Sequence, residues 1–247
     1  MPESRARVLV HPTAREAARA VADFLARSVR TTPDLVLGLP TGRTMIAVYD
    51  SLVELHARGR LPLGGVTAFN LDEFDGLMRG DPGSFAAYMR THFYSRVRMR
   101  RGACRFPPVT GGDPIAYDRD IAGCGGLDIC LLGLGANGHI GFNEPAATLA
   151  PQTHRVRLQP ATRRANAYLF GGRVSRVPKH AISMGIATML QARVVVLLAT
   201  GAGKASIVRR ALTGPITTRV PASLIQAHPH AVVFLDRDAS SQLTTNK

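Results

Sequence analysis

The 247-residue chain is 45% hydrophobic and 19% charged and has a formal net charge of +14. This length suits one sizeable folded domain, and the composition excludes fibrous, low-complexity and intrinsically disordered proteins. No apolar stretch of about eighteen or more residues occurs, so no membrane span is expected. The N-terminal segment MPESRARVLVHP lacks the apolar core of a secretory signal, which predicts a cytoplasmic protein.

The basic character and the cysteines narrow the class of partner. Five arginines gather in YSRVRMRRGACR, but no aromatic side chains alternate with them to stack on bases, so no nucleic-acid partner is expected. The charge instead predicts a positive field that attracts anionic substrates. Cys104, Cys124 and Cys130 are odd in number and lack C-x-x-C spacing, which predicts reduced thiols and no zinc site.

Short apolar runs alternate with helical patterns along the chain, which is typical of a mainly parallel sheet with crossover helices. The first helix begins at the capping box Thr13-Ala-Arg-Glu16. The predicted strands span residues 7–10, 35–38, 66–70, 127–132, 193–199 and 231–235. The predicted helices span residues 13–28, 44–57, 84–93, 181–190 and 204–212.

The order of these elements predicts one domain, because no internal repeat and no long linker divides residues 1–247. Residues 153–179 are the least regular part of the chain. Phe170-Gly-Gly172 within them is predicted to hinge a mobile cover.

Four polar or glycine-rich segments directly follow predicted strands. An open α/β sheet binds its ligand at the carboxyl ends of its strands, so these segments are expected to meet around one site. They are GLPTGRT (38–44), the segment at Asp72, LGLGANGHIGFNEP (132–145) and TGAGK (200–204).

The segment GLPTGRT places Thr41, Gly42 and Thr44 around a helix N-terminus, where backbone N–H groups can hold a phosphate. An ordinary strand-to-helix turn has the same spacing, but Arg43 favours an anion. The GxxxxGK[ST] spacing of a P-loop is absent, so a nucleoside triphosphate is not expected. Lys204 would add a point charge to the same phosphate, although a lysine at a helix start is often simply solvated.

The loop with His139, Asn137 and Glu144 is too polar to be core, and it favours acid–base chemistry on a polar metabolite. His139 alone would equally suit a hydrogen-bonded turn. Asp72 and Glu73 could likewise cap a helix or face solvent, as adjacent acids usually do. A carboxylate in a partly dry pocket is, however, a suitable base for a proton next to a carbonyl. Metal-ligand spacing such as HExxH is absent, so no metal is expected.

These segments, in this order, resemble the glucosamine-6-phosphate deaminase family, the glucosamine/galactosamine-6-phosphate isomerases. The similarity extends over nearly the whole chain and includes FNLDEFDG (69–76), GSFAAYMRTHFY (83–94), VPKHAISMGIATML (177–190) and GAGKA (201–205). It implies a doubly wound α/β fold with a mainly parallel sheet and helices on both faces, like ribose-phosphate isomerase and the CoA-transferases. It also implies a hydrolase of amino-sugar metabolism, in N-acetylglucosamine catabolism, that turns glucosamine 6-phosphate and water into fructose 6-phosphate and ammonia.

The resemblance also implies a role for each site residue. His139 opens the sugar ring by moving a proton between O1 and O5, and Asn137 and Glu144 orient and polarise its imidazole. Asp72 takes the C2 proton and returns it at C1. No metal or redox cofactor is implied, because an aldose–ketose shift moves only protons.

Two positions depart from the family pattern. Asn137 stands where the well-known members carry aspartate, so the relay to His139 depends more on Glu144. Tyr168 stands where the pattern has an arginine that binds the substrate phosphate from a flexible lid. Arg43 is expected to compensate from the opposite side, and Arg163, Arg164 and Arg173 are the alternatives.

Two rival functions stay open at this point. A 6-phosphogluconolactonase-type hydrolase would share the fold but needs no base at C2, so Asp72 separates the two. A sugar-phosphate-binding protein without turnover is the other rival. For the leading hypothesis we expect a small-molecule amino-sugar phosphate as partner, no nucleic acid, no membrane, and a monomer or small homo-oligomer.

Overall fold

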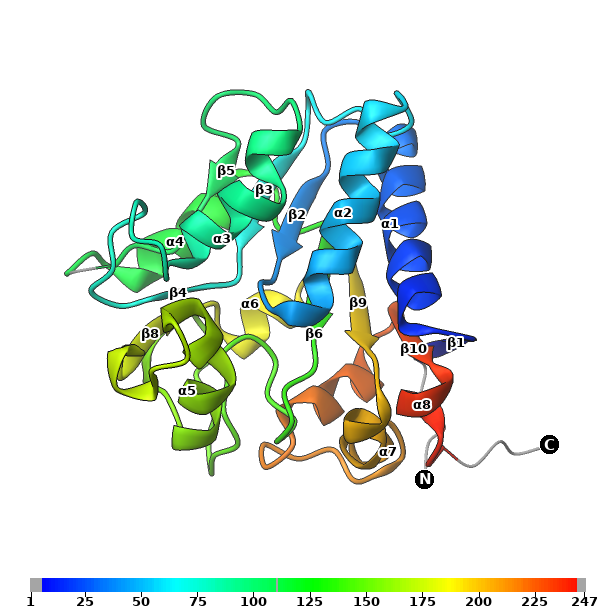
Figure 1. Cartoon of the computed structure of the whole chain (residues 1–247), viewed down its shortest axis with the longest axis vertical. Helices are drawn as coiled ribbons and strands as arrows, with labels where there is room; N and C mark the ends of the chain where they lie inside the picture. The colour runs from blue at the N-terminus through cyan, green and yellow to red at the C-terminus, as the bar shows by residue number, and fades with distance from the viewer. Residues whose placement is uncertain (1–5, 110, 244–247) are drawn as a thin grey trace.

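The central element of the computed structural model, which describes residues 6–109 and 111–243, is a seven-stranded sheet (Figure 1). The strand order is β1-β10-β9-β6-β2-β3-β5, and every neighbouring pair is parallel. The strands are β1 (Arg7–His11), β2 (Val36–Leu39), β3 (Thr67–Asn70), β5 (Cys104–Arg105), β6 (Ile129–Gly133), β9 (Val194–Ala199) and β10 (Ala231–Asp236).

Alternate residues of the central strands enter two separate cores. In β6, Ile129 and Leu131 face the helices on one side, whereas Cys130 and Leu132 face those on the other. A parallel strand covered on both faces therefore needs a continuous apolar run, which is how β6 reads in the sequence. The first side carries α1 (Ala14–Thr31), α2 (Arg43–Ala57) and α3 (Phe85–His92). The second side carries α4 (Pro114–Gly123), α6 (Ile186–Leu190), α7 (Ala205–Thr213) and α8 (Arg237–Ser240). The doubly wound fold predicted from the sequence is confirmed.

The strand order brings the four expected loops to one edge. Strands β9, β6, β2 and β3 are consecutive neighbours in the sheet. Because they are parallel, their carboxyl ends lie side by side, and the segments that follow them do too. The order of the strands in the sheet therefore explains why these four loops lie next to one another.

A smaller antiparallel sheet lies beside this edge, at lower left in Figure 1. Its order is β4-β8-β7, and Asp72 of β4 pairs with Ser183 of β8. A third core of aromatic and aliphatic residues, including Phe74, Phe85 and Phe142, lies against it. The elements of this region are β4 (Asp72–Phe74), β7 (His154–Arg157), β8 (His180–Ser183), α5 (Pro160–Asn166) and the short 3-10 helices η2 (Ala167–Phe170) and η3 (Val174–Arg176).

The small sheet corrects two expectations. The helix predicted over 181–190 is wrong in its first half, because residues 180–183 form β8 and α6 begins at Ile186. The apolar run fits either element by its pattern, and only pairing with β4 and β7 makes it a strand. The irregular stretch 153–179 contains β7 and α5, so it is more ordered than its sequence indicated. Both α4 and β5 were absent from the sequence prediction.

Among the described residues, no helix has the length and apolar character needed to span a bilayer.

Candidate active site

The glycine-rich loop after β6 holds a hydrogen-bonded chain of three side chains. The amide Nδ2 of Asn137 donates to Glu144 Oε2 at 2.8 Å, and its Oδ1 lies 2.7 Å from His139 Nδ1. Nδ1 of His139 is also 3.5 Å from Glu144 Oε2. A Cβ at position 135 would overlap the His139 ring, so Gly135 is needed for the imidazole to fold back over its own loop.

This chain determines which nitrogen of His139 carries the proton. A carboxylate only accepts hydrogen bonds, so the NH₂ group of Asn137 must face Glu144 and its oxygen must face the imidazole. Nδ1 of His139 therefore donates to Asn137, which leaves Nε2 as an acceptor when the ring is neutral. The imidazole can then take up a proton at Nε2 without rearranging its partners.

Glu144 is buried and stays ionised. Burial by itself raises the pKa of its carboxyl, but the hydrogen bond and charge of His139, with hydrogen bonds from Thr162 and Asn137, outweigh burial and lower the pKa to about 2. Thr162 Oγ1 donates to Glu144 Oε1 at 2.5 Å. The result is a fixed negative charge 3.5 Å from Nδ1 of the imidazole.

Asp72 and Glu73 have different roles, although they are adjacent in the sequence. Glu73 accepts backbone N–H groups of Phe74, Phe85 and Ala86 at 2.8 Å each, so it caps the N-terminus of α3. The helix-cap alternative therefore holds for Glu73. Oδ1 of Asp72 is buried and has no hydrogen-bond partner among the described residues. Burial, with a smaller contribution from the charge of Glu73, raises the pKa of Asp72 to about 8.

The carboxyl of Asp72 lies against the loop that carries His139. A Cβ built on Gly141 would be 3.6 Å from Asp72 Oδ2. Ser183, which pairs with Asp72 across the small sheet, accepts the N–H of Phe142 in the same loop at 3.0 Å. The small sheet thus fixes a carboxyl from β4 beside the imidazole loop from β6, on one edge of the molecule.

The N-terminus of α2 is open and carries a cation. Gly42 precedes the helix with a φ of 115°, a conformation that favours glycine, and no side chain caps the helix. Thr41 and Thr44 flank this turn and are half-buried. The hydroxyl of Tyr88 donates to the Gly42 carbonyl at 2.8 Å, which holds the turn in place. Backbone N–H groups at such a terminus can bind an anion.

Arg43 and Tyr168 are in direct contact at this point. The guanidinium carbon of Arg43 lies 4.4 Å from the centroid of the Tyr168 ring. Tyr168 belongs to η2, which follows α5 in the region over the small sheet. Arg163 donates hydrogen bonds to the carbonyls of Val174 and Val177 within its own region. Arg164 and Arg173 are exposed.

Lys204 follows β9, so it lies across the glycine-rich loop from the N-terminus of α2. Its Nζ donates to the carbonyl of Leu134 at 2.7 Å, and burial lowers its pKa. Asp236 accepts the N–H of Gly201 and so fixes the turn that leads to Lys204. Like α2, the following helix α7 has no side-chain cap and begins beside a cation.

Several supporting residues were absent from the sequence prediction. Thr162 and Gln159 contact Glu144 from the region over the small sheet, and Tyr88 supports Gly42. Ser183 links Asp72 to the loop. They are ordinary polar residues in the sequence, and nothing in their spacing distinguishes them.

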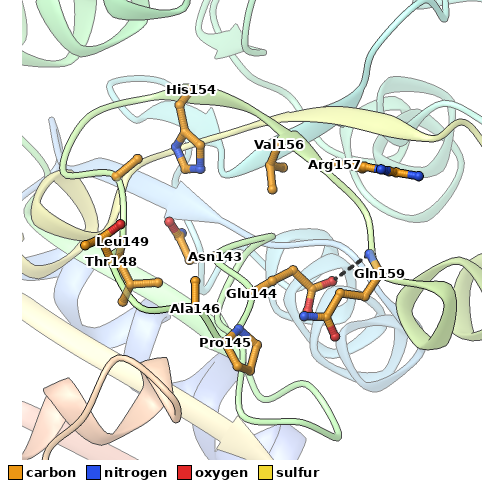
Figure 2. Close-up of a pocket in the computed structure, with 11 residues that line it drawn as sticks. Asn143, Glu144, Pro145, Ala146, Thr148, Leu149, His154, Val156, Arg157 and Gln159 are labelled. Carbon is orange, nitrogen blue, oxygen red and sulfur yellow. Dashed lines mark hydrogen bonds between the residues drawn. The ribbon is translucent and has the colours of Figure 1, made fainter.

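A separate pocket of about 490 Å³ borders Glu144 (Figure 2). It is lined by the segment from Asn143 to Ala150 on one side and by β7 and Gln159 on the other. Asp72 and His139 do not line it, so it is not the place where the acid and base groups meet. In the part of the chain that the structure describes, no cluster of three histidine, cysteine or acidic residues could hold a metal ion.

Comparisons with known proteins identify the family of this chain. Residues 11–234 match the family model for glucosamine-6-phosphate isomerases/6-phosphogluconolactonase. The glucosamine-6-phosphate deaminase of Halothermothrix orenii is 40% identical over 96% of this chain and 100% of its own length. That of Rhodopirellula baltica is 43% identical over 94% of both chains.

Solved structures of two relatives also superpose on this chain. A monomeric glucosamine-6-phosphate deaminase superposes with a TM-score of 0.91 at 37% identity, over 96% of this chain and 99% of its own. The 6-phosphogluconolactonase from Leishmania guyanensis superposes with a TM-score of 0.73 at 17% identity, over 97% of this chain and 99% of its own, which is a likeness of fold.

Proposed function

The chain belongs to the family of glucosamine-6-phosphate isomerases and 6-phosphogluconolactonases, and we propose that it is a deaminase, converting glucosamine 6-phosphate and water into fructose 6-phosphate and ammonia. The observation that carries the proposal is the carboxyl of Asp72 beside Gly141, in the loop of His139. A lactonase needs no base at C2, whereas a deaminase does. Asp72 therefore favours the deaminase over the second branch of the family.

His139 opens the sugar ring. Its Nε2 takes the proton from the O1 hydroxyl and delivers it to the ring oxygen O5. Asn137 holds the ring through Nδ1, and the anionic Glu144 lowers the energy of the imidazolium that forms on the way. A positioned acid–base group of this kind typically contributes about 10²- to 10⁴-fold in rate.

Asp72 then moves a proton between two carbons. Its carboxylate takes the proton from C2 of the open-chain amino sugar and returns it to C1. The carbonyl oxygen O1 takes a proton from the ammonium group on C2, so a hydroxyl forms at C1 and a protonated imine at C2. Water adds to that carbon, and ammonia leaves. The raised pKa of Asp72 makes it a stronger base than an exposed carboxylate. A protonated amine on C2 of the substrate would favour the ionised carboxylate by charge attraction.

The phosphate is assigned to the open N-terminus of α2. The backbone at Thr41, Gly42 and Thr44 would donate hydrogen bonds, and Arg43 and Lys204 would supply positive charge. Tyr168 completes this set by its contact with Arg43.

The groups that we assign to the reaction come from both sheets, so we treat residues 1–247 as one catalytic domain. We expect a protein of the cytoplasm that acts as a monomer or small homo-oligomer on a small amino-sugar phosphate. A metal or redox cofactor has no part in the proposed steps, because they move only protons and water.

The test is an assay of the purified protein with glucosamine 6-phosphate, in which ammonia and fructose 6-phosphate are measured separately. The proposal expects the two products in equal amounts, and no acceleration of 6-phosphogluconolactone hydrolysis. Rapid lactone hydrolysis without ammonia release would assign the protein to the other branch. Saturable binding of glucosamine 6-phosphate with no product after hours would indicate a binding protein.

A further inference from the structure

The pairing of Arg43 with Tyr168 has a consequence for substrate selection. We infer that Tyr168 is a positioning residue, which holds the Arg43 guanidinium at the mouth of the α2 N-terminus through its ring and so sets the preference for phosphorylated over unphosphorylated sugars. The inference rests on the proposed function for the identity of the ligand as a sugar phosphate. Tyr168 acts through Arg43 and does not itself touch the substrate.

Arg43 has its charge available. It is the first residue of α2, it is exposed, and the first turn contains no acidic residue. Among the described residues it forms no ion pair, whereas Arg19, Arg58 and Arg96 each reach a carboxylate. A cation at a helix N-terminus faces the positive end of the helix dipole, so the position is unfavourable unless an anion is bound there.

The ring of Tyr168 leaves the N–H groups of Arg43 available for that anion. A guanidinium stacked on an aromatic face keeps its edge free, and its five donors lie in that plane. The stack removes rotamer freedom from a long side chain that would otherwise move in solvent. The contact with Tyr168 thereby restricts the side chain of Arg43, the first residue of the uncapped helix α2.

Tyr168 can impose this position because its own segment is fixed. Ala167 is buried in the third core, and Phe170 lies edge-on to Phe74 with ring centroids 5.4 Å apart. A Cβ on Gly83 would lie 2.5 Å from Phe170 Cε1, so this ring fits closely over the turn before α3. The 3-10 helix that carries Tyr168 is held on both sides of the tyrosine.

The hydroxyl of Tyr168 has no part in the inference. It is buried and has no hydrogen-bond partner among the described residues. The ring and the hydroxyl can therefore be separated by experiment, since Tyr168→Phe keeps the ring and Tyr168→Leu removes it.

The experiment measures binding of glucitol 6-phosphate, an open-chain sugar phosphate without an amine, by isothermal titration calorimetry at fixed ionic strength. Glucitol without phosphate is the matched neutral probe. Arg43→Ala is expected to weaken binding of the phosphorylated probe about 10- to 100-fold, the usual loss for a charge-assisted hydrogen bond. Tyr168→Leu is expected to weaken it about 3- to 10-fold, and Tyr168→Phe by less than about 2-fold. Arg164→Ala, in α5 of the same region, is the control and is expected to bind like wild type.

A double-mutant cycle separates positioning from a general structural effect. In the Arg43→Ala background, Tyr168→Leu should cause no further loss, because the ring then has nothing to position. In steady-state assays with glucosamine 6-phosphate, Tyr168→Leu should raise KM and leave kcat within about 2-fold.

Three results would overturn the inference: equal losses in Tyr168→Phe and Tyr168→Leu, a full further loss in the double variant, or unchanged binding in Arg43→Ala. Failure of the proposed function gives a different pattern, in which no variant or wild type releases ammonia while the order of probe affinities is unaffected.

Discussion

Replacing Asp72 by asparagine should make the protein more stable and, at the same time, remove most of its ammonia-releasing activity. The carboxyl of Asp72 is buried, and its Oδ1 has no hydrogen-bond partner among the described residues. Burial, with the nearby Glu73, raises its pKa from 3.8 to about 8. The protein therefore bears a free-energy cost at this position that a neutral side chain of the same shape avoids.

The size of the effect follows from the two pKa values. Between them the folded protein holds a proton that the unfolded chain has released, so stability falls as the pH rises from about 4 and levels off above about 8. At pH 7, about three units above the unfolded pKa of 3.8, this titration lowers the free energy of unfolding by about 4 kcal/mol, taken as an upper limit. Asp72→Asn lacks this titration, so its advantage should grow with pH and vanish near pH 4.

The assay is urea unfolding of both proteins at several pH values between 4 and 9, together with kcat for ammonia release. Asp34→Asn, at an exposed position, is the matched control and should follow wild type throughout. Turnover by Asp72→Asn should fall about 10²-fold or more, because the amide cannot take the C2 proton. For wild type, kcat/KM should rise with pH up to about 8, as Asp72 ionises.

The reasoning is refuted if Asp72→Asn and wild type lose stability in parallel as the pH rises. It is equally refuted if the variant is stabilised but turns over glucosamine 6-phosphate at the wild-type rate, since Asp72 would then be buried without acting as the base.

Three further substitutions test the site around it. Gly135→Ala should reduce kcat at least about 10-fold, since its Cβ would displace the His139 ring, whereas Gly123→Ala meets no atom within 4 Å and should keep full activity. Glu73→Gln should destabilise the fold by about 1–3 kcal/mol in urea unfolding, because one amide oxygen cannot replace a carboxylate that accepts three N–H groups. Glu144→Gln should lower the free energy of unfolding by up to about 3 kcal/mol at pH 7. The pKa of Glu144, about 2, lies below the unfolded value, so the loss should shrink as the pH falls from about 4.5 to 2, and a loss that stays constant with pH would contradict this lowered pKa.

Much of the fold follows from local pattern. The buried parallel strands are continuous apolar runs, and the sequence prediction matches β2, β6, β9 and β10 closely. The capping box at Thr13 marks the start of α1, where the Thr13 hydroxyl accepts the N–H of Glu16. These signals are carried by neighbouring residues, so they can be read without the rest of the chain.

The candidate site could be predicted only in part from local sequence pattern. Asn137, His139 and Glu144 are close in sequence, and their convergence in one loop was expected. The strand at 180–183 was missed, because its pairing partners Asp72–Phe74 and 154–157 lie far away along the chain. A short apolar run does not distinguish a strand from a helix until such partners are known.

The sequence by itself determined the alternation of the main parallel strands with helices, the glycine-rich loop with its acid–base residues, and the open turn before α2. Only the tertiary structure decided that Glu73 caps a helix, that Oδ1 of Asp72 has no hydrogen-bond partner among the described residues, and that Arg43 contacts Tyr168. The physical reason is that burial, pKa and side-chain contact depend on which distant segments pack together. Local pattern specifies what each segment can form, and long-range packing selects the environment in which its side chains act.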